Sequence, residues 1–534
     1  EASVPPNGVN CSGCGVELQC LDVAAPGFVP AEKYRALSDG PSGLRAAVCQ
    51  RCWLLAHYGR ASQLLRLPPQ QHREVVSAAL RRPQRFGRGP LLLYVLDVME
   101  LPDPVLPQLP ALLSPDVPAG GVLVLGNKVD LLPADSPGHL KRLRQRVVEA
   151  CVQAGLRGAP LVDVRLVSAK TGFGLEGLVS RLQSSWRCTG DVYLLGATNS
   201  GKSTLFNTLL RSDYCKSRAH DVVDRATVSP WPGTTLNLLK FPIINPTSDR
   251  IFRRQERLRG EAAKTEDELS SEERKYLNHL KKQGYLVAHG VPPQADPAQA
   301  TSSSCPSGPH LLAFPTPPGM ENYRGDFLVP WHTNSQPPAV CDLCVLNLLT
   351  DKEVKLVLPT QAIVPRTFIL KPGMTLFLAA LGRVDYLEGE KSAWFSVVAS
   401  NRLPVHVAPV SSADEMYSKH AGQEFFKVPM GGEERMKEFP PLVPQDVTLR
   451  GVGSTQAVAD LKLSSAGWVA VTAPEEEKLL LRAYTPKGTT LVVREPPLLP
   501  YISTIRGARI PGTAAYWTRK PPALVENLRR TGEK

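Results

Sequence analysis

The sequence Gly-Ala-Thr-Asn-Ser-Gly-Lys-Ser at residues 196–203 decides the fold, because it fits the phosphate-loop pattern G-x-x-x-x-G-K-[ST]. An apolar run at 191–195 predicts a strand before it, and residues 203–210 predict a helix after it. The glycines let backbone N–H groups turn toward phosphates, and the helix N-terminus adds positive potential. Lys202 would reach the β- and γ-phosphates, and Ser203 would ligate Mg²⁺. The alternative, a chance match in a glycine-rich loop, does not account for these flanks.

A second motif lies upstream of the phosphate loop. An apolar run at 121–125 predicts a buried strand, and Asn-Lys-Val-Asp follows it at 127–130. In this arrangement Asp130 accepts hydrogen bonds from the N1–H and N2–H₂ groups of guanine, a donor pair that adenine lacks. Asn127 braces the loop, and the stem of Lys128 lies over the base. The same four letters occur by chance in surface turns, so the assignment depends on its neighbours.

Those neighbours support guanine. A strand at 161–167 leads into Ser-Ala-Lys at 168–170, a tripeptide that places a backbone N–H on guanine O6. With an apolar run at 90–97, strands and helices alternate, which predicts an α/β fold with a mostly parallel sheet covered by helices on both faces. In an ordinary GTPase the phosphate loop precedes the guanine motif, whereas here the guanine motif at 127–130 comes first. The sequence therefore predicts a circularly permuted GTPase domain.

Pro-Gly-Thr-Thr at 232–235 follows the phosphate loop at a plausible distance for a first switch. One of its threonines would bind Mg²⁺ when the γ-phosphate is present; the alternative is a turn leading into a strand. The predicted catalytic residues are Lys202, Thr234 and Thr235, and the predicted Mg²⁺ ligands are Ser203 and Thr235. The predicted nucleotide contacts are Asn127, Lys128, Asp130, Ser168, Ala169, Lys170, Gly196, Asn199, Ser200, Gly201, Lys202, Ser203 and Thr204.

The second switch, D-x-x-G in other GTPases, is not recognisable. The nearest candidate is Phe314–Met320, which has a Thr-Pro and a glycine but lacks the acidic residue. Its surroundings, from Val291 to Cys341, are rich in Pro, Ser and Ala and lack periodicity. No catalytic glutamine follows the glycine, so we expect intrinsic turnover to be slow or to depend on an ion or a partner.

Two C-x-x-C pairs, Cys11 with Cys14 and Cys49 with Cys52, are separated by residues 15–48. Two such pairs give a closed tetrahedral Cys₄ site, which is structural and typical of zinc. The alternative is a redox pair or disulfides. The chain has 11 cysteines, an odd number, which favours a reducing compartment over a disulfide scaffold. A third pair, Cys341 with Cys344, has no partner pair, and we interpret it as incidental.

The chain of 534 residues is too long for one core, so two to four domains are expected. Its net charge is +12 and its pI about 9.2. Arg60–Arg88 holds seven arginines against one acid, and Ile502–Lys534 combines basic residues with Tyr516 and Trp517. Cations beside aromatic rings suit nucleic acid, and the alternative is a basic solvated surface. No run is apolar enough to cross a bilayer, and any targeting peptide would be missing from a chain that begins at Glu1.

Composition and motifs divide the chain into successive parts. We expect a zinc knuckle at 1–60, a basic linker or helix at 61–89, and the permuted GTPase domain at 90–345. Within that domain 249–340 is an insertion that begins with a densely charged helix or helical pair at Asp249–Gln283. Short apolar strands with Pro-Gly turns predict a β-rich or α+β domain at 346–534, which would bind RNA and end in a basic tail.

The Cys₄ knuckle, followed by NKVD, SAK and GATNSGKST in permuted order and then PGTT, resembles the YqeH-type circularly permuted GTPases. The stretches 371–400 and 464–471 look like those of an animal mitochondrial member. The resemblance implies a matrix GTPase that assists assembly of the small ribosomal subunit, with GTP or GDP, Mg²⁺ and Zn²⁺ bound and contact with ribosomal RNA. It also implies K⁺-stimulated hydrolysis with Asn199 as a K⁺ ligand, although Asn199 could instead only hydrogen-bond its own backbone. The family has Asp-Thr-Pro-Gly where this chain has Thr-Pro-Pro-Gly at 316–319.

Two rival functions stay open at this point. The missing acidic residue near Gly319 is compatible with an RNA-binding scaffold that holds nucleotide without hydrolysing it. The arginine-rich segments are compatible with a GTPase recruited peripherally to an anionic surface such as the inner membrane.

Overall fold

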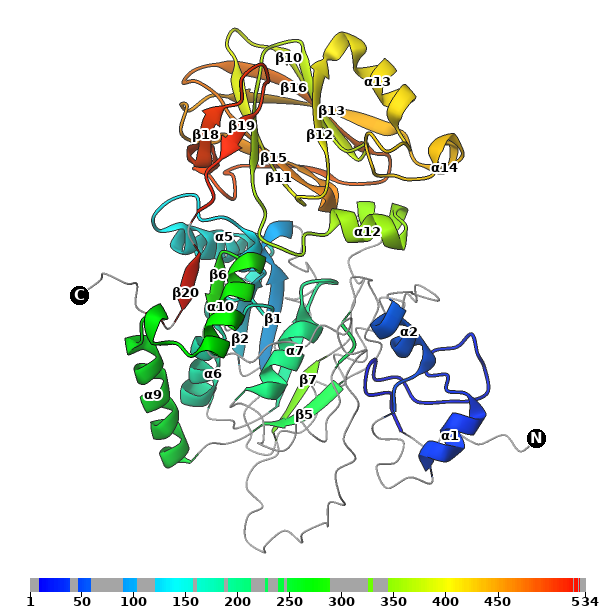
Figure 1. Cartoon of the computed structure of the whole chain (residues 1–534), viewed down its shortest axis with the longest axis vertical. Helices are drawn as coiled ribbons and strands as arrows, with labels where there is room; N and C mark the ends of the chain where they lie inside the picture. The colour runs from blue at the N-terminus through cyan, green and yellow to red at the C-terminus, as the bar shows by residue number, and fades with distance from the viewer. Residues whose placement is uncertain are drawn as a thin grey trace, which may run out of the picture.

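The computed structural model describes residues 9–38, 47–58, 90–102, 121–156, 161–186, 191–212, 226–228, 239–243, 247–288, 325–329, 344–521, 523–526 and 528. A central α/β unit carries a β-rich domain at one end, and a cysteine-rich unit lies beside it (Figure 1). In the part of the chain that the structure describes, no helix has the length and apolar character needed to cross a membrane.

The central sheet is formed, in the described residues, by six strands in the order β3-β2-β1-β4-β7-β5. Their bounds are β1 (Leu91–Asp97), β2 (Gly121–Asn127), β3 (Leu161–Leu166), β4 (Val192–Gly196), β5 (Leu239–Ile243) and β7 (Gly325–Val329). All neighbouring pairs are parallel except β5 with β7. Every residue of β1, β2 and β4 is buried, which explains why these strands are apolar runs without alternation.

The strand order explains how a permuted chain makes an ordinary GTPase sheet. The phosphate-loop strand β4 lies between β1, which precedes it in the chain, and β7, which follows it. Because β1, β2 and β4 are parallel, their carboxyl ends meet at one edge of the sheet. The predicted permuted, mostly parallel GTPase fold is confirmed.

Helices cover both faces of this sheet (Figure 1). The amphipathic α5 shows why: its buried residues Leu143, Val147, Ala150 and Cys151 recur at helical spacing. The predicted charged helical pair after Asp249 is present, and the second of these helices begins at a capping box between Ser270 and Glu273. The helices of the central unit are α5 (His139–Gln153), α6 (Leu175–Arg181), α7 (Lys202–Arg211), α9 (Ser248–Ala263) and α10 (Ser271–Gln283).

The region expected to be an insertion, 249–340, contributes to the sheet itself. It contains β7, which pairs with the phosphate-loop strand, and the short strand β6 (Leu286–Ala288). The GTPase domain also extends beyond its expected end at residue 345, because β20 (Leu524–Glu526), close to the end of the chain, pairs in parallel with β6. In Figure 1 this last strand lies beside the central unit rather than in the β-rich domain.

The β-rich domain consists of two antiparallel five-stranded sheets, in the orders β12-β9-β10-β16-β13 and β17-β14-β15-β11-β8, within the described residues. Both sheets contribute to one buried core, for example through Leu376, Leu481 and Phe395. The bounds of the first sheet are β9 (Met374–Leu378), β10 (Gly382–Glu388), β12 (Val405–Pro409), β13 (Leu442–Arg450) and β16 (Lys478–Pro486). Those of the second are β8 (Arg366–Leu370), β11 (Ala393–Ala399), β14 (Ala459–Leu463), β15 (Gly467–Thr472) and β17 (Leu491–Arg494).

Smaller elements surround these two sheets. The two-stranded ribbon of β18 (Arg506–Arg509) and β19 (Tyr516–Thr518) follows the second sheet. The flanking helices are α12 (Asp351–Val357), α13 (Ala413–His420) and α14 (Gly432–Glu438), and the N-terminal unit contributes α1 (Ala31–Ser38) and α2 (Gln50–Tyr58).

A continuous interface joins the β-rich domain to the GTPase domain. Apolar residues of both domains, including Val147 of α5 and Trp468 of β15, belong to one buried cluster. Lys462 of β14 donates to Glu100, just beyond β1, both at the backbone O (3.0 Å) and at the carboxylate (2.8 Å). Arg494 of β17 donates to the O of Leu101 at 3.0 Å. Polar contacts from the β-rich domain therefore hold the segment that leaves the central strand.

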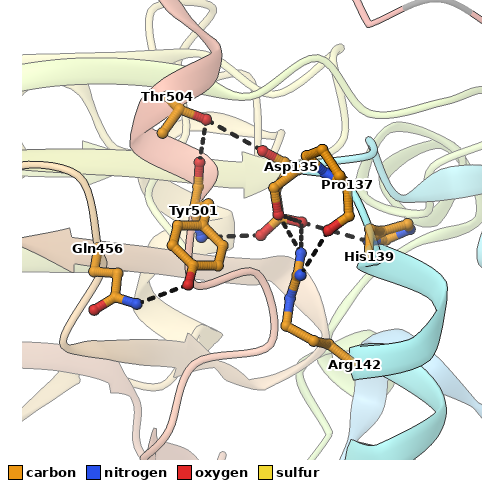
Figure 2. A network of polar contacts seen from close by, with 8 residues as sticks. Asp135, Pro137, His139, Arg142, Gln456, Tyr501 and Thr504 are labelled. Atoms are coloured by element: carbon orange, nitrogen blue, oxygen red, sulfur yellow. Dashed lines mark hydrogen bonds and ion pairs between the residues drawn. The ribbon is translucent and has the colours of Figure 1, made fainter.

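Asp135, just upstream of α5, is the centre of a second interdomain contact (Figure 2). Its carboxylate accepts hydrogen bonds from the N–H of Tyr501 and from Arg142, both at 2.9 Å. Thr504 donates to the backbone O of Asp135, and Arg142 lies over the ring of Tyr501. Burial would raise the pKa of Asp135, but the hydrogen bonds from His139 and Tyr501 outweigh it and hold the pKa below its ordinary value of 3.8.

This lowered pKa makes the interface sensitive to acid. A carboxyl with a lowered folded pKa contributes stability above its unfolded pKa and loses it as pH falls through the folded value. We expect Asp135→Asn to reduce the free energy of unfolding by about 1–3 kcal/mol near neutral pH, because buried donors lose a charged acceptor. The difference between variant and parent, followed by thermal unfolding, should shrink below about pH 4. Asp446→Asn, which removes an exposed partner of Arg482, should have little effect at any pH.

Candidate nucleotide-binding site and cysteine cluster

The phosphate loop connects β4 to α7 at the carboxyl edge of the sheet. Gly196 has φ +149°, and a Cβ there would lie 2.1 Å from the backbone O of Val95. Gly201 has φ +92°, and a Cβ there would lie 2.2 Å from the side-chain nitrogen of Asn127. Both positions therefore require glycine, one for the close approach of two strands and one for the close approach of two motifs.

Lys202 is buried in this loop. Its Nζ donates to the backbone O of Gly196 at 2.8 Å and to that of Ala197. Burial lowers the pKa of Lys202 to about 7, and the nearby charge of Lys128 adds to this. An anion held in the loop would favour the charged lysine, so these residues fit a phosphate group. Ser203 and Thr204 lie in the first turn of α7, where Mg²⁺ and phosphate contacts are predicted.

Asn127 joins the three predicted nucleotide motifs. Its side-chain N–H donates to the backbone O of Ser200 in the phosphate loop at 2.7 Å. Its side-chain O accepts the N–H of Ala169 in the Ser-Ala-Lys loop at 2.9 Å. Asn127 is 2% exposed, so both hydrogen bonds are shielded from water. The sequence predicted Asn127 as a brace, and the structure shows which loops it braces.

Asp130, the predicted guanine acceptor, is also buried. Burial raises its pKa, and a hydrogen bond from Ser168 opposes this shift. A buried carboxylate is favoured by further donors, which the N1–H and N2–H₂ groups of guanine would supply. The donor set that this carboxylate needs therefore fits the predicted base.

Lys128 has a partner that the sequence did not identify. Its Nζ donates to Asp97, the last residue of β1, at 2.6 Å, and its backbone is left-handed with φ +69°. Asp97 also caps the short 3₁₀ helix η2 (Val98–Glu100) by accepting the N–H of Met99. In the sequence, the only indication of this role of Asp97 is that an acidic residue ends an apolar run. The side chain of Lys170 contacts the entry to the β-rich domain, where its Nζ donates to the O of Thr360 at 2.8 Å.

The structure brings the phosphate, base and tripeptide loops together but leaves the switch predictions outside its described residues. Thr234 and Thr235 are not among those residues, and neither is Phe314–Met320. The sheet topology nevertheless bears on the second switch. Because β7 runs parallel to β4, the chain leaves Val329 at the same edge as the phosphate loop. A second switch at the phosphate edge of the sheet would therefore come after Val329 in the sequence. The candidate Phe314–Met320 comes before β7 instead.

The segment 226–228, just before the predicted first switch, contacts two other parts of the protein. The side-chain amide of Asn207 on α7 both donates to and accepts from the backbone of Ala226, at 3.0 and 2.8 Å. The N–H of Thr227 donates to the O of Gly13, between the first two clustered cysteines, at 3.1 Å. This segment therefore connects the phosphate-loop helix to the cysteine cluster.

Cys11, Cys14, Cys49 and Cys52 are all buried, and their sulfur atoms lie within 4.8 Å of one another. Four sulfur atoms about 2.3 Å from one zinc ion would lie about 3.8 Å apart, and Cys14 and Cys49 are 3.8 Å apart. The N–H of Cys49 donates to the sulfur of Cys11, an outer contact that supports a thiolate. Hydrogen bonds with the other three sulfur atoms lower the pKa of Cys11, and the bond with Cys14 has the largest effect. Hydrogen bonds with the other three sulfur atoms raise the pKa of Cys52, and the bond with Cys11 has the largest effect. The cluster fits a tetrahedrally coordinated Zn²⁺ ion, whose charge would stabilise the thiolate form of the four cysteines.

We expect the purified chain to contain about one zinc ion, because a closed Cys₄ set is characteristic of structural zinc. Elemental analysis should show that Cys14→Ser loses most of this zinc and lowers the thermal unfolding midpoint. Cys20→Ser is the matched control, since Cys20 lies near the cluster but outside it. Equal zinc contents in the parent and in Cys14→Ser would contradict the assignment.

Comparisons with known proteins agree with this site. A family model described as 50S ribosome-binding GTPase matches residues 191–252, and one described as YqeH-like, C-terminal matches residues 392–496. Nitric oxide-associated protein 1 of Homo sapiens is 50% identical over 573 residues, covering 99% of this chain and 80% of the human protein. The uncharacterized protein YqeH of Bacillus subtilis is 26% identical, covering 91% of this chain and 98% of YqeH. NO-associated protein 1, chloroplastic/mitochondrial, of Arabidopsis thaliana is 24% identical over 86% of this chain. This chain therefore belongs to the family of GTP-binding GTPases that contains nitric oxide-associated protein 1 and YqeH.

Proposed function

We propose that this protein is a GTPase that assists assembly of the small ribosomal subunit in the mitochondrial matrix and binds ribosomal RNA according to its nucleotide state. The observation that carries the proposal is the buried Asn127 bridge, which holds the phosphate, guanine and Ser-Ala-Lys loops together inside a chain with two further modules. An organelle is supported by the printed name of the Arabidopsis thaliana relative, chloroplastic/mitochondrial. A ribosomal partner is supported by the description of the matching family model, which names the 50S subunit rather than the small one.

An exposed basic ribbon in the β-rich domain is the part of the described chain that best fits RNA. Trp517 on β19 is 63% exposed, and Arg509, Arg519 and Lys520 around it are exposed as well. Tyr516 differs from Trp517, because it contacts Trp394 and lies near the guanidinium of Arg506. Trp517 is therefore the base-stacking candidate, and Tyr516 anchors the ribbon. The other predicted basic segment, Arg60–Arg88, lies outside the described residues.

Hydrolysis in this proposal is slow and stimulated by K⁺. Asn199 has a left-handed backbone with φ +55°, which places it at a sharp turn inside the phosphate loop. Its side-chain amide carries a carbonyl-type oxygen, the hard ligand that a cation such as K⁺ takes. A K⁺ ion there would add positive charge beside the developing charge on the phosphates.

We expect GTP turnover with Mg²⁺ to be about tenfold faster in K⁺ than in Na⁺ buffer, a difference of roughly 1.4 kcal/mol in activation free energy. Asn199→Ala should remove the difference between the two salts while GDP binding persists. Lys202→Ala should abolish turnover in both. Tight GTP binding without turnover in either salt would instead identify a non-hydrolysing RNA-binding scaffold.

The RNA and ribosome proposal is tested by co-sedimentation with isolated small- and large-subunit particles. We expect the parent chain to bind the small subunit more strongly with a non-hydrolysable GTP analogue than with GDP. Trp517→Ala should weaken binding by about 1–3 kcal/mol, the usual contribution of one base–aromatic stack. Phe252→Ala is the control, since Phe252 is an aromatic residue on α9 that is 56% exposed. Preference for the large subunit, or binding indifferent to nucleotide, would reject this part of the proposal.

A further inference from the structure

The two loops that would contact the base are held from outside by segments far away in the chain. The N–H of Tyr285 donates to the backbone O of Asp130 at 3.3 Å. The N–H of Ile363 donates to the O of the next residue, Leu131, at 2.9 Å. The second half of the guanine motif is therefore fixed by the chain before β6 and by the entry to the β-rich domain.

The Ser-Ala-Lys loop is a compact unit with its own external contacts. Internally, the N–H of Ser168 donates to the O of Phe173, and the N–H of Thr171 donates to the hydroxyl of Ser168. Externally, the hydroxyl of Thr171 donates to the O of Leu286 at 2.8 Å, and the N–H of Ala288 donates to the O of Thr171 at 3.2 Å. The loop is thus held against both ends of β6.

The last strand of the described chain completes these contacts. The Glu526 carboxylate accepts the N–H of Gly174, at the end of the same loop, at 2.6 Å. Gly174 has φ +74°, and a Cβ there would lie 2.4 Å from the O of Leu166, so this position of the turn requires glycine. Burial raises the pKa of Glu526, and the Gly174 N–H opposes that shift. The half-buried Glu526 side chain therefore contacts the loop directly through this hydrogen bond.

Strand β20 itself is docked on β6. The two strands pair in parallel with Leu524 opposite Leu286, and the N–H of Leu524 donates to the O of Tyr285 at 2.6 Å. Val525 packs against the apolar cluster of α10 and β6, which includes Leu277. Figure 1 shows β20 beside β6 and α10, on the GTPase side of the molecule. The tail strand, β6 and the base loops therefore form one connected set of hydrogen bonds.

We propose that β20 is a structural part of the guanine pocket and that Glu526 is a positioning residue for base binding, acting through Gly174 and the Ser-Ala-Lys loop. Docking of the tail and retention of guanine nucleotide are then coupled. Coupling between two binding events is reciprocal, so each must strengthen the other by the same factor. The inference goes beyond the proposed ribosomal function, because it requires only that the protein binds guanine nucleotide.

The first test is the dissociation rate of fluorescent GDP. Glu526→Ala removes the acceptor for Gly174, and we expect dissociation to become about tenfold faster, within the usual range for coupled sites. Glu526→Gln is the matched control, because its amide oxygen can still accept that N–H; it should stay within about twofold of the parent. The unfolding midpoint should change little in either variant. Equal dissociation rates for Glu526→Ala and the parent would overturn the proposal.

The second test uses the unmodified chain and does not depend on how a variant folds. We expect GDP to slow amide hydrogen exchange in Leu524–Glu526 as well as in the phosphate loop, because the coupling is reciprocal. The ribbon Arg506–Thr518 is the internal control and should exchange equally fast with and without GDP. Protection of the phosphate loop without protection of β20 would show that the tail only covers apolar surface, and would overturn the proposal.

Discussion

The two hydrogen bonds of the Asn127 side chain are the constraint on which the nucleotide site depends. This amide donates to the phosphate loop and accepts from the Ser-Ala-Lys loop. It lies so close to Gly201 that a Cβ at that position would clash with it. The guanine motif, the Ser-Ala-Lys loop and the phosphate loop follow the parallel strands β2, β3 and β4. The sheet therefore brings them to one edge, and the Asn127 amide fixes the distances between them. Circular permutation leaves this arrangement intact, because it changes the order of the strands along the chain and not their order in the sheet.

Permutation does change what the ends of the domain can carry. The β-rich domain follows β7, and it contacts the segments that leave β1 and β2, through Lys462 with Glu100 and through Tyr501 with Asp135. Asp97 lies three residues before Glu100 and holds Lys128 of the guanine motif. Contacts with the appended domain therefore begin within one turn of residues that position the base. Because these connections are only a few residues long, the residues that position the base are linked directly to the residues of the domain interface.

The sequence was informative where a function depends on residues close together in the chain. Glycines, lysine and asparagine of the phosphate loop have a fixed local spacing, and so do the cysteine pairs, so both could be predicted from the sequence. The contacts of Asp97, Asp135 and Glu526 join residues far apart in sequence, and no local pattern marks an acid that will be buried by a distant strand. Strand β7 was missed for a similar reason: it is a short strand within a stretch without periodicity, and its pairing with β4 depends on tertiary structure.

The two appended modules contact different segments around the nucleotide site. On the base side, the β-rich domain and the tail strand hold the loops around Asp130 and Ser168. On the phosphate side, Thr227 donates to Gly13, which lies between two of the clustered cysteines, and Asn207 links the same segment to α7. A movement of residues 226–228 must therefore either carry the cysteine unit along or break the hydrogen bond to Gly13. The predicted first switch begins only a few residues later, so the cysteine unit is attached next to that segment of the chain. The β-rich domain is attached instead to the segments around the guanine motif.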